Sequence, residues 1–118
     1  MKRLLWIGSS KGDLKEFPDE VQDEMGYGLY LAQMGERHKH AKPLTGLGSA
    51  KVIELRENDR SGTYRVMYTV EMDEFVFVLH AFHKKSKKGK ETPKPEVDLI
   101  VRRYKDAEAL YKQLKEEE

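Results

Sequence analysis

Alternation of apolar and polar positions in the middle of the chain predicts a run of β-strands. Residues 63–72 carry β-branched and aromatic side chains at high density, and every second one falls on the same face. Residues 51–57 precede this segment across a turn-forming Asn-Asp-Arg-Ser-Gly sequence, and residues 75–83 follow it across a shorter turn. Residues 2–7 alternate more weakly and predict a short first strand.

Helical periodicity marks two other segments. Between residues 13 and 35, apolar side chains recur at steps of three and four residues. Pro18, followed by two acidic residues, suits the start of a new helix, whereas Gly26 and Gly28 predict a bend or a break further along. Residues 96–118 carry one apolar stripe and predict the last helix.

The predicted order of elements is β-α-β-β-β-α, with residues 37–50 and 84–95 as loops. Strands joined by short turns favour antiparallel pairing, and helices with an apolar stripe must pack on the sheet that results. We therefore predict the α+β class, with an antiparallel sheet and helices packed on one face. A chain of 118 residues has room for one core, so residues 1–118 are expected to form a single domain.

Composition narrows the classes of function. Charged residues make up 36% of the chain and hydrophobic ones 38%, which is typical of a folded domain and not of a disordered chain. The lack of cysteine excludes disulfides, a thiol nucleophile and a thiolate metal site. No apolar run approaches the roughly 20 residues of a membrane span, and the first one is too short for a signal peptide, so a cytoplasmic location is expected.

The net charge of +1 hides a strong segregation of charge along the chain. Residues 13–24 contain six acidic residues and one lysine, and the chain closes on three glutamates. Between residues 37 and 65, bases outnumber acids seven to three. Such runs are either solvated faces or binding surfaces, and the local field decides which ligand approaches each of them.

A cluster of lysines follows the last predicted strand, in the sequence HAFHKKSKKGK. It is either a solvated loop or a site that neutralises a polyanion, with counterion release as the driving force. Phe82 precedes the cluster, and an aromatic ring next to bases suits the stacking of a single-stranded nucleic acid. The lysines of the cluster are Lys84, Lys85, Lys87, Lys88 and Lys90.

Arg56 and Arg65 are the strongest candidates for a phosphate site. Strand alternation places both side chains on the face that the helices are expected to leave open. Two guanidinium groups on adjacent strands can hold one phosphate through paired N–H donors. The alternative is that each arginine forms a cross-strand ion pair, for instance with Glu54 or Glu71.

The four histidines are the candidates for acid–base and metal chemistry. His83 is the best candidate for proton transfer, because an imidazole titrates near neutral pH. His38 and His40 lie two residues apart without a third ligand nearby in the sequence, so no metal site is expected. His80 is expected to have a structural role. No phosphate-binding glycine loop or Ser/His/Asp arrangement is present.

Three stretches of the sequence together resemble the RelE/ParE toxin superfamily, and within it the phage-derived HigB-like branch. They are KPLTGLGSAKVIELREND, GTYRVMYTV and FVFVLHAFHKKSKKGKETPKPEVDLIVRRYKD. The resemblance implies a curved antiparallel sheet and the activity of a metal-free, ribosome-dependent mRNA endonuclease that inhibits translation. In that chemistry the 2′-hydroxyl of the RNA attacks the adjacent phosphate, and cationic side chains stabilise the developing charge.

Position by position, the resemblance also implies a site. Two groups of residues are assigned, with no cofactor and no metal. The catalytic group comprises Arg56, Arg65, His83, Lys84 and Lys85, with His83 or a lysine of lowered pKa as the proton carrier. The RNA-binding group comprises Lys42, Tyr68, Phe82, Lys87, Lys88 and Lys90.

The partners implied are mRNA on the ribosome and a cognate antitoxin that carries a helix-turn-helix domain, with no membrane. Two alternatives stay open. One is a ParE-like toxin of the same fold that inhibits gyrase by binding, in which the basic surface is a docking site without catalysis. The other is a non-enzymatic nucleic-acid-binding protein of phage origin.

Overall fold

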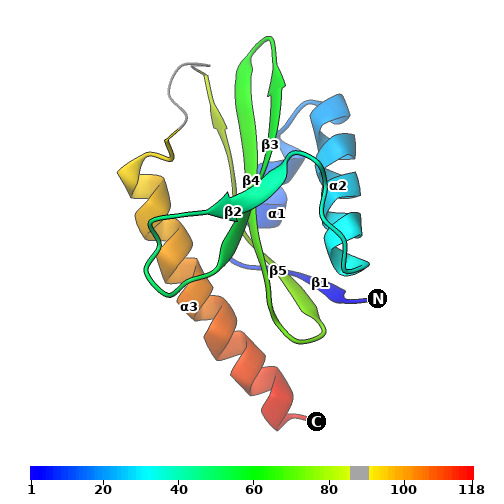
Figure 1. The fold of residues 1–118 in the computed structure, drawn as a ribbon, viewed down its shortest axis with the longest axis vertical. Helices are drawn as coiled ribbons and strands as arrows, with labels where there is room; N and C mark the ends of the chain where they lie inside the picture. Colours follow the sequence, from blue (N-terminus) through cyan, green and yellow to red (C-terminus); the bar gives the residue numbers. More distant parts are fainter. Residues whose placement is uncertain (86–90) are drawn as a thin grey trace.

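A computed structural model describes residues 1–85 and 91–118, which form five strands and three helices (Figure 1). In chain order these are β1 (Arg3–Trp6), α1 (Ser10–Lys15), α2 (Asp19–Gln33), β2 (Ala41–Leu44), β3 (Val52–Asp59), β4 (Gly62–Met72), β5 (Phe75–Lys84) and α3 (Lys94–Glu116). Within these residues, no helix has both the length and the apolar character that crossing a bilayer needs.

The strands form one sheet in the order β1-β5-β4-β3-β2. The four strands from β2 to β5 pair with their neighbours in antiparallel fashion, whereas β1 pairs with β5 in parallel. The β3–β4 turn depends on Gly62, which has φ of +133°, and a Cβ atom there would lie 2.2 Å from the carbonyl oxygen of Lys84. This glycine therefore lets β5 approach the turn closely.

Helices cover both faces of the sheet, with α1 and α2 on one side and α3 on the other (Figure 1). Neighbouring residues of β4 show the division, because Val66 belongs to the core under α2 and Met67 to the core under α3. The α+β class is confirmed, but the prediction that all helices pack on one face is wrong for α3. The physical reason is that β4 and β5 carry apolar side chains on both faces, and each face needs a cover.

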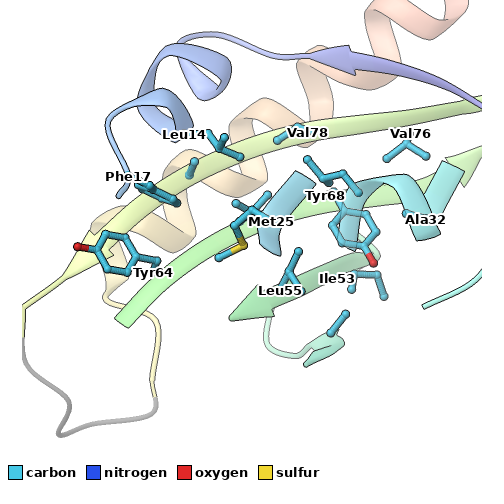
Figure 2. Packing of buried hydrophobic residues seen from close by; sticks show 14 of the residues in the cluster. Leu14, Phe17, Met25, Ala32, Ile53, Leu55, Tyr64, Tyr68, Val76 and Val78 are labelled. Carbon is cyan, nitrogen blue, oxygen red and sulfur yellow. The ribbon is translucent and has the colours of Figure 1, made fainter. Parts of the chain in front are cut away.

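The core under α2 is built around large side chains from the centre of the sheet (Figure 2). Met25 of α2 is completely buried, as is Leu55 of β3, and the rings of Tyr64 and Tyr68 extend from β4 into the same layer. α2 begins just after Pro18, as the sequence predicts, but it continues through its two glycines without the expected break.

The core under α3 draws on the opposite positions of the same strands. Ile100 and Ala107 of α3 are completely buried against β4 and β5, where Met67, Phe77 and Leu79 are buried. The first turn of α3 lies over β5, where Glu96 contacts His80, and Thr92 just before the helix contacts Arg65. The start of α3 therefore covers part of the face that carries Arg65. This cover determines which cations of the candidate site stay accessible.

Candidate nucleic-acid site

Arg56 and Arg65 are direct cross-strand partners on β3 and β4, so they project from the same face, as strand alternation predicts. They do not form an empty clamp, because the carboxylate of Glu54 bridges them. Arg56 Nη2 donates to Glu54 Oε1 at 2.8 Å, and Arg65 Nη1 donates to Glu54 Oε2 at 3.3 Å. The alternative interpretation, a cross-strand ion pair with Glu54, is therefore confirmed for Arg65, whereas Arg56 pairs with Glu54 within its own strand.

Arg65 is a buried residue, with only 1% of its side chain exposed. Its Nη1 also donates to the hydroxyl of Thr92 at 3.2 Å, and its guanidinium lies 5.8 Å from the ring centroid of Phe82. Burial lowers the pKa of Arg65, and the charge of Arg56 lowers it further, while Glu54 raises it. The expectation that Arg65 faces an open surface is wrong, because Thr92 and the ring of Phe82 contact its guanidinium group and the residue is buried.

A second buried polar group holds α3 beside this cluster. The His80 ring, 6% exposed, hydrogen-bonds through Nε2 to the carboxylate of Glu96 in α3, and it stacks on Phe82. Arg103 of α3 donates to the carbonyl oxygen of Leu79 at 3.0 Å. His80 is therefore a structural residue, as expected, and the polar contacts around it support the cover over Arg65.

Arg56 differs from Arg65 because 23% of its side chain is exposed and because it lines a cavity of about 380 Å³ at the edge of β3. We call this the basic cavity. Lys42, one of the predicted RNA-binding residues, lies on its wall together with Lys39 and His40. The remaining lining residues are Ala41, Glu57 and Asn58. The cavity therefore joins four basic side chains, which come from β3, from β2 and from the segment just before β2.

His40 contributes an imidazole to the basic cavity, a role that was not predicted from the sequence. Its Nδ1 lies 2.6 Å from Glu57 Oε1, and 49% of its side chain is exposed. A carboxylate at this distance fixes the orientation of the ring. This pair could not be predicted from the sequence. It depends on how the segment before β2 aligns with β3, and local side-chain patterns do not determine that alignment.

The basic end of β5 is described only in part. Lys84 is half-buried and lies opposite Thr63 of β4, and Lys85 is exposed. Strand alternation places Lys84 on the same face as Arg65. Lys87, Lys88 and Lys90 lie outside the described residues.

His83 projects from the other face of the sheet. It pairs directly with Tyr64, and the two rings stack with centroids 4.2 Å apart. Its Nε2 lies 2.8 Å from the carbonyl oxygen of Ser61, to which it donates. Since Tyr64 belongs to the core under α2, the structure separates His83 from Arg56 and from the basic cavity. The expectation that His83 works beside the arginines is corrected accordingly.

Two aromatic residues that were assigned to RNA have other positions in the fold. Tyr68 is 1% exposed within the core under α2, and burial raises the pKa of its hydroxyl. A ring so buried cannot stack on a nucleotide, so Tyr68 is corrected to a core residue. Phe82 is half-buried, and its ring already stacks on His80 and contacts the guanidinium group of Arg65.

One histidine group lies close enough to suggest a metal site among the residues that the structure describes. Glu57 joins His38 and His40, with ligand atoms within 4.8 Å of one another, so the expectation that no third ligand lies nearby is wrong. However, the amide of His40 donates to His38 Nδ1 at 2.9 Å. A neutral His38 then carries its proton on Nε2, where it donates to Glu24 at 2.7 Å, and it has no free lone pair for a metal.

The fold defined by this sheet and its helices is that of the RelE toxins. The chain is similar to the RelBE2 toxin–antitoxin complex from Mycobacterium tuberculosis, with 20% identity and a TM-score of 0.51, over 72% of this chain and 93% of that one. It is also similar to the isolated E. coli RelE toxin, with 17% identity and a TM-score of 0.51, over 86% of this chain and 98% of that one. Comparison with curated proteins finds no match.

The family is defined more closely by sequence. Residues 12–105 match the family model of the phage derived protein Gp49-like (DUF891). The chain therefore belongs to the phage-derived Gp49-like family, and its resemblance to the RelE toxins is confirmed at the level of the fold.

Proposed function

We propose that this protein is the toxin of a type II toxin–antitoxin system and acts as a metal-free, ribosome-dependent mRNA endonuclease in the cytoplasm. The observation that carries the proposal is the basic cavity, in which Arg56, Lys39 and Lys42 surround a space of about 380 Å³ beside an exposed imidazole. Membership of a phage-derived family with a RelE-like fold supports the assignment to this class.

The chemistry needs no oxidant and no cofactor. The 2′-oxygen of the RNA forms a bond to the adjacent phosphorus, and the bond from phosphorus to the 5′-oxygen breaks, which leaves a 2′,3′-cyclic phosphate and a 5′-hydroxyl. One proton leaves the 2′-oxygen and one reaches the 5′-oxygen. Positive groups aimed at the phosphate stabilise the charge that develops there.

The structure changes the roles that we propose for individual residues. Arg56 contacts the phosphate, with Lys39 and Lys42 around it, and His40 replaces His83 as the proposed proton carrier because it lies on the wall of the same cavity. Glu57 orients the His40 ring. Lys84 and Lys85 remain candidates for contacts with the RNA backbone.

Arg65 and Glu54 form the support beneath this cavity. With its side chain buried, Arg65 cannot reach an RNA phosphate without moving the cover formed by Thr92 and α3. We therefore assign it the role of holding Glu54, which in turn fixes the direction of Arg56.

The test is cleavage of a defined mRNA in a purified translation system, mapped by primer extension. The wild type is expected to cut only in the presence of ribosomes, and Arg56→Ala is expected to cut about 10²–10³-fold more slowly. Lys112→Ala, an exposed lysine of α3, is the matched control and should keep full activity.

Two other results would favour the two alternative functions, a gyrase inhibitor or a nucleic-acid-binding protein without catalysis. A folded wild-type protein that leaves mRNA intact but blocks supercoiling by gyrase is a ParE-like inhibitor. Binding of RNA that falls in Arg56→Ala, without cleavage by either protein, indicates a nucleic-acid-binding protein that is not an enzyme. The proposed antitoxin partner is tested separately, by co-purification with the product of the neighbouring reading frame.

A further inference from the structure

The outer face of α2 carries an exposed apolar stripe that the proposed activity does not use. Tyr27 is 52% exposed, Tyr30 47% and Met34, the residue that caps the end of α2, 50%. Their spacing of three and four residues places them on one side of the helix. Among the described residues, only Met1 is another large apolar residue with this degree of exposure. Tyrosine and methionine are enriched at the centres of protein interfaces.

The first half of the same helix is acidic. α2 contains four acidic residues and no basic one in its sequence DEVQDEMGYGLYLAQ. A cavity of about 450 Å³ opens beside this half, between α2 and the end of β3. Five carboxylates line it, from Asp19, Glu20, Glu24, Glu57 and Asp59. A surface with this field attracts cationic side chains and repels phosphate.

His38 connects the apolar stripe to the acidic cavity. It is only 3% exposed, it lies edge-on to Tyr27 with ring centroids 5.8 Å apart, and its Nε2 is 2.7 Å from Glu24 Oε1. Tyr27 and Glu24 both contact this buried ring from adjacent turns of α2, so the apolar stripe adjoins the acidic cavity, and we call the two together the α2 surface. It lies on the flank of the molecule formed by α2 (Figure 1).

We propose that the α2 surface docks a basic amphipathic helix of a partner protein. The apolar face of that helix covers Tyr27, Tyr30 and Met34, and its lysine or arginine side chains enter the acidic cavity. RNA does not fit, because its phosphates would meet five carboxylates. A symmetric second copy of this chain does not fit either, because a two-fold interface would place the acidic half against itself or leave it unpaired.

Docking there also reaches the basic cavity, since both cavities share Glu57 and Asn58 in their walls. A cationic side chain of the partner competes with His40 for the carboxylate of Glu57. The α2 surface is therefore a regulatory surface as well as a binding one. This regulatory role rests on the proposed function, whereas the docking itself does not.

The docking is tested with a synthetic 18-residue helix of leucine and lysine at amphipathic spacing, titrated into the ¹⁵N-labelled protein. Chemical-shift changes are expected along α2, and the affinity measured by calorimetry should fall as salt rises. The double substitution Tyr30→Ser/Met34→Ser is expected to weaken binding at least about tenfold. Lys112→Ser on α3 is the matched control, and circular dichroism checks that each variant is folded.

Several outcomes would overturn the proposal. Equal binding of a peptide with the same composition in scrambled order, or of one with glutamate in place of lysine, removes the claimed recognition. Shift changes that map to α3, or unchanged affinity in the folded double variant, remove the claimed location. A wild-type dimer that the double variant abolishes assigns the stripe to a second copy. None of these readings depends on RNA cleavage, so failure of docking and failure of the proposed activity are distinguishable.

Discussion

Arg56 and Arg65 lie opposite each other on adjacent strands and share one carboxylate, yet only Arg56 reaches the surface. The shared partner is Glu54, which lies two residues before Arg56 on the same strand and face. The three side chains form a positively charged cluster, in which Arg65 and Glu54 are buried and Arg56 is partly exposed. This arrangement divides the two arginines into one that supports the site and one that a ligand can contact.

Neutralising Glu54 should destabilise the protein strongly. Glu54→Gln keeps the shape of the side chain but leaves two neighbouring guanidinium groups without their shared charge. Removing one partner of a buried ion pair costs about 3–5 kcal/mol, so the free energy of unfolding should fall by that amount in urea denaturation. Glu71→Gln, at an exposed position of β4, is the control and should change stability by less than about 0.5 kcal/mol. Equal effects of the two substitutions would contradict the role assigned to Glu54.

Tyr68 provides a direct test of the correction from RNA contact to core residue. Tyr68→Ala removes a ring from the centre of the core under α2, and a loss of about 3–5 kcal/mol in unfolding free energy is expected. Tyr68→Phe keeps the ring and should leave RNA binding, measured by fluorescence anisotropy, unchanged. A folded Tyr68→Phe variant with weakened RNA binding would restore the original assignment.

The alkaline stability of the protein should depend on Tyr111. Its hydroxyl donates to the carboxylate of Asp73, and this hydrogen bond, with burial and the negative charge of Asp73, raises the pKa of Tyr111. A group whose pKa is higher in the folded state stabilises that state below its unfolded pKa, here about 10, and the contribution is lost as pH rises through the folded value.

In urea denaturation between pH 8 and 11, the wild type should therefore lose stability over a range that begins near pH 10. Tyr111→Phe lacks the titrating group, so its midpoint should fall less steeply over this range. Tyr30→Phe removes an exposed tyrosine of α2 and is the control. Identical slopes for the wild type and Tyr111→Phe would exclude the proposed linkage.

Much of the fold could be predicted because the pattern of side chains is local. The bounds predicted for β3, β4 and β5 differ from the observed ones by at most two residues, and α2 starts where Pro18 indicated. The strand β2 was missed within a predicted loop. It contains Pro43, which a strand tolerates here because β2 lies at the edge of the sheet and pairs only with β3.

The position of α3 was harder to predict, although the sequence contained an indication that a helix covers each face of the sheet. The continuous apolar run FVFVL in β5 is typical of a strand that is buried on both faces, which requires a helix on each side. Strand alternation predicted correctly that the two arginines share a face. It could not predict that α3 would cover Arg65, nor that His40 would approach Glu57, since both depend on contacts between distant segments.

Gly28 and Gly26 offer a matched pair within one helix. A Cβ atom at Gly28 would lie 2.4 Å from Cδ2 of Leu55, a completely buried residue of β3, whereas a Cβ atom at Gly26 meets nothing within 4 Å. Gly28→Ala should therefore lower the unfolding free energy by about 1–3 kcal/mol through overpacking. Gly26→Ala should raise it by about 0.5–1 kcal/mol, because alanine is the better helix former. Thermal and urea unfolding of the two variants measure both effects, and a stabilising Gly28→Ala would show that α2 can move away from the sheet without cost.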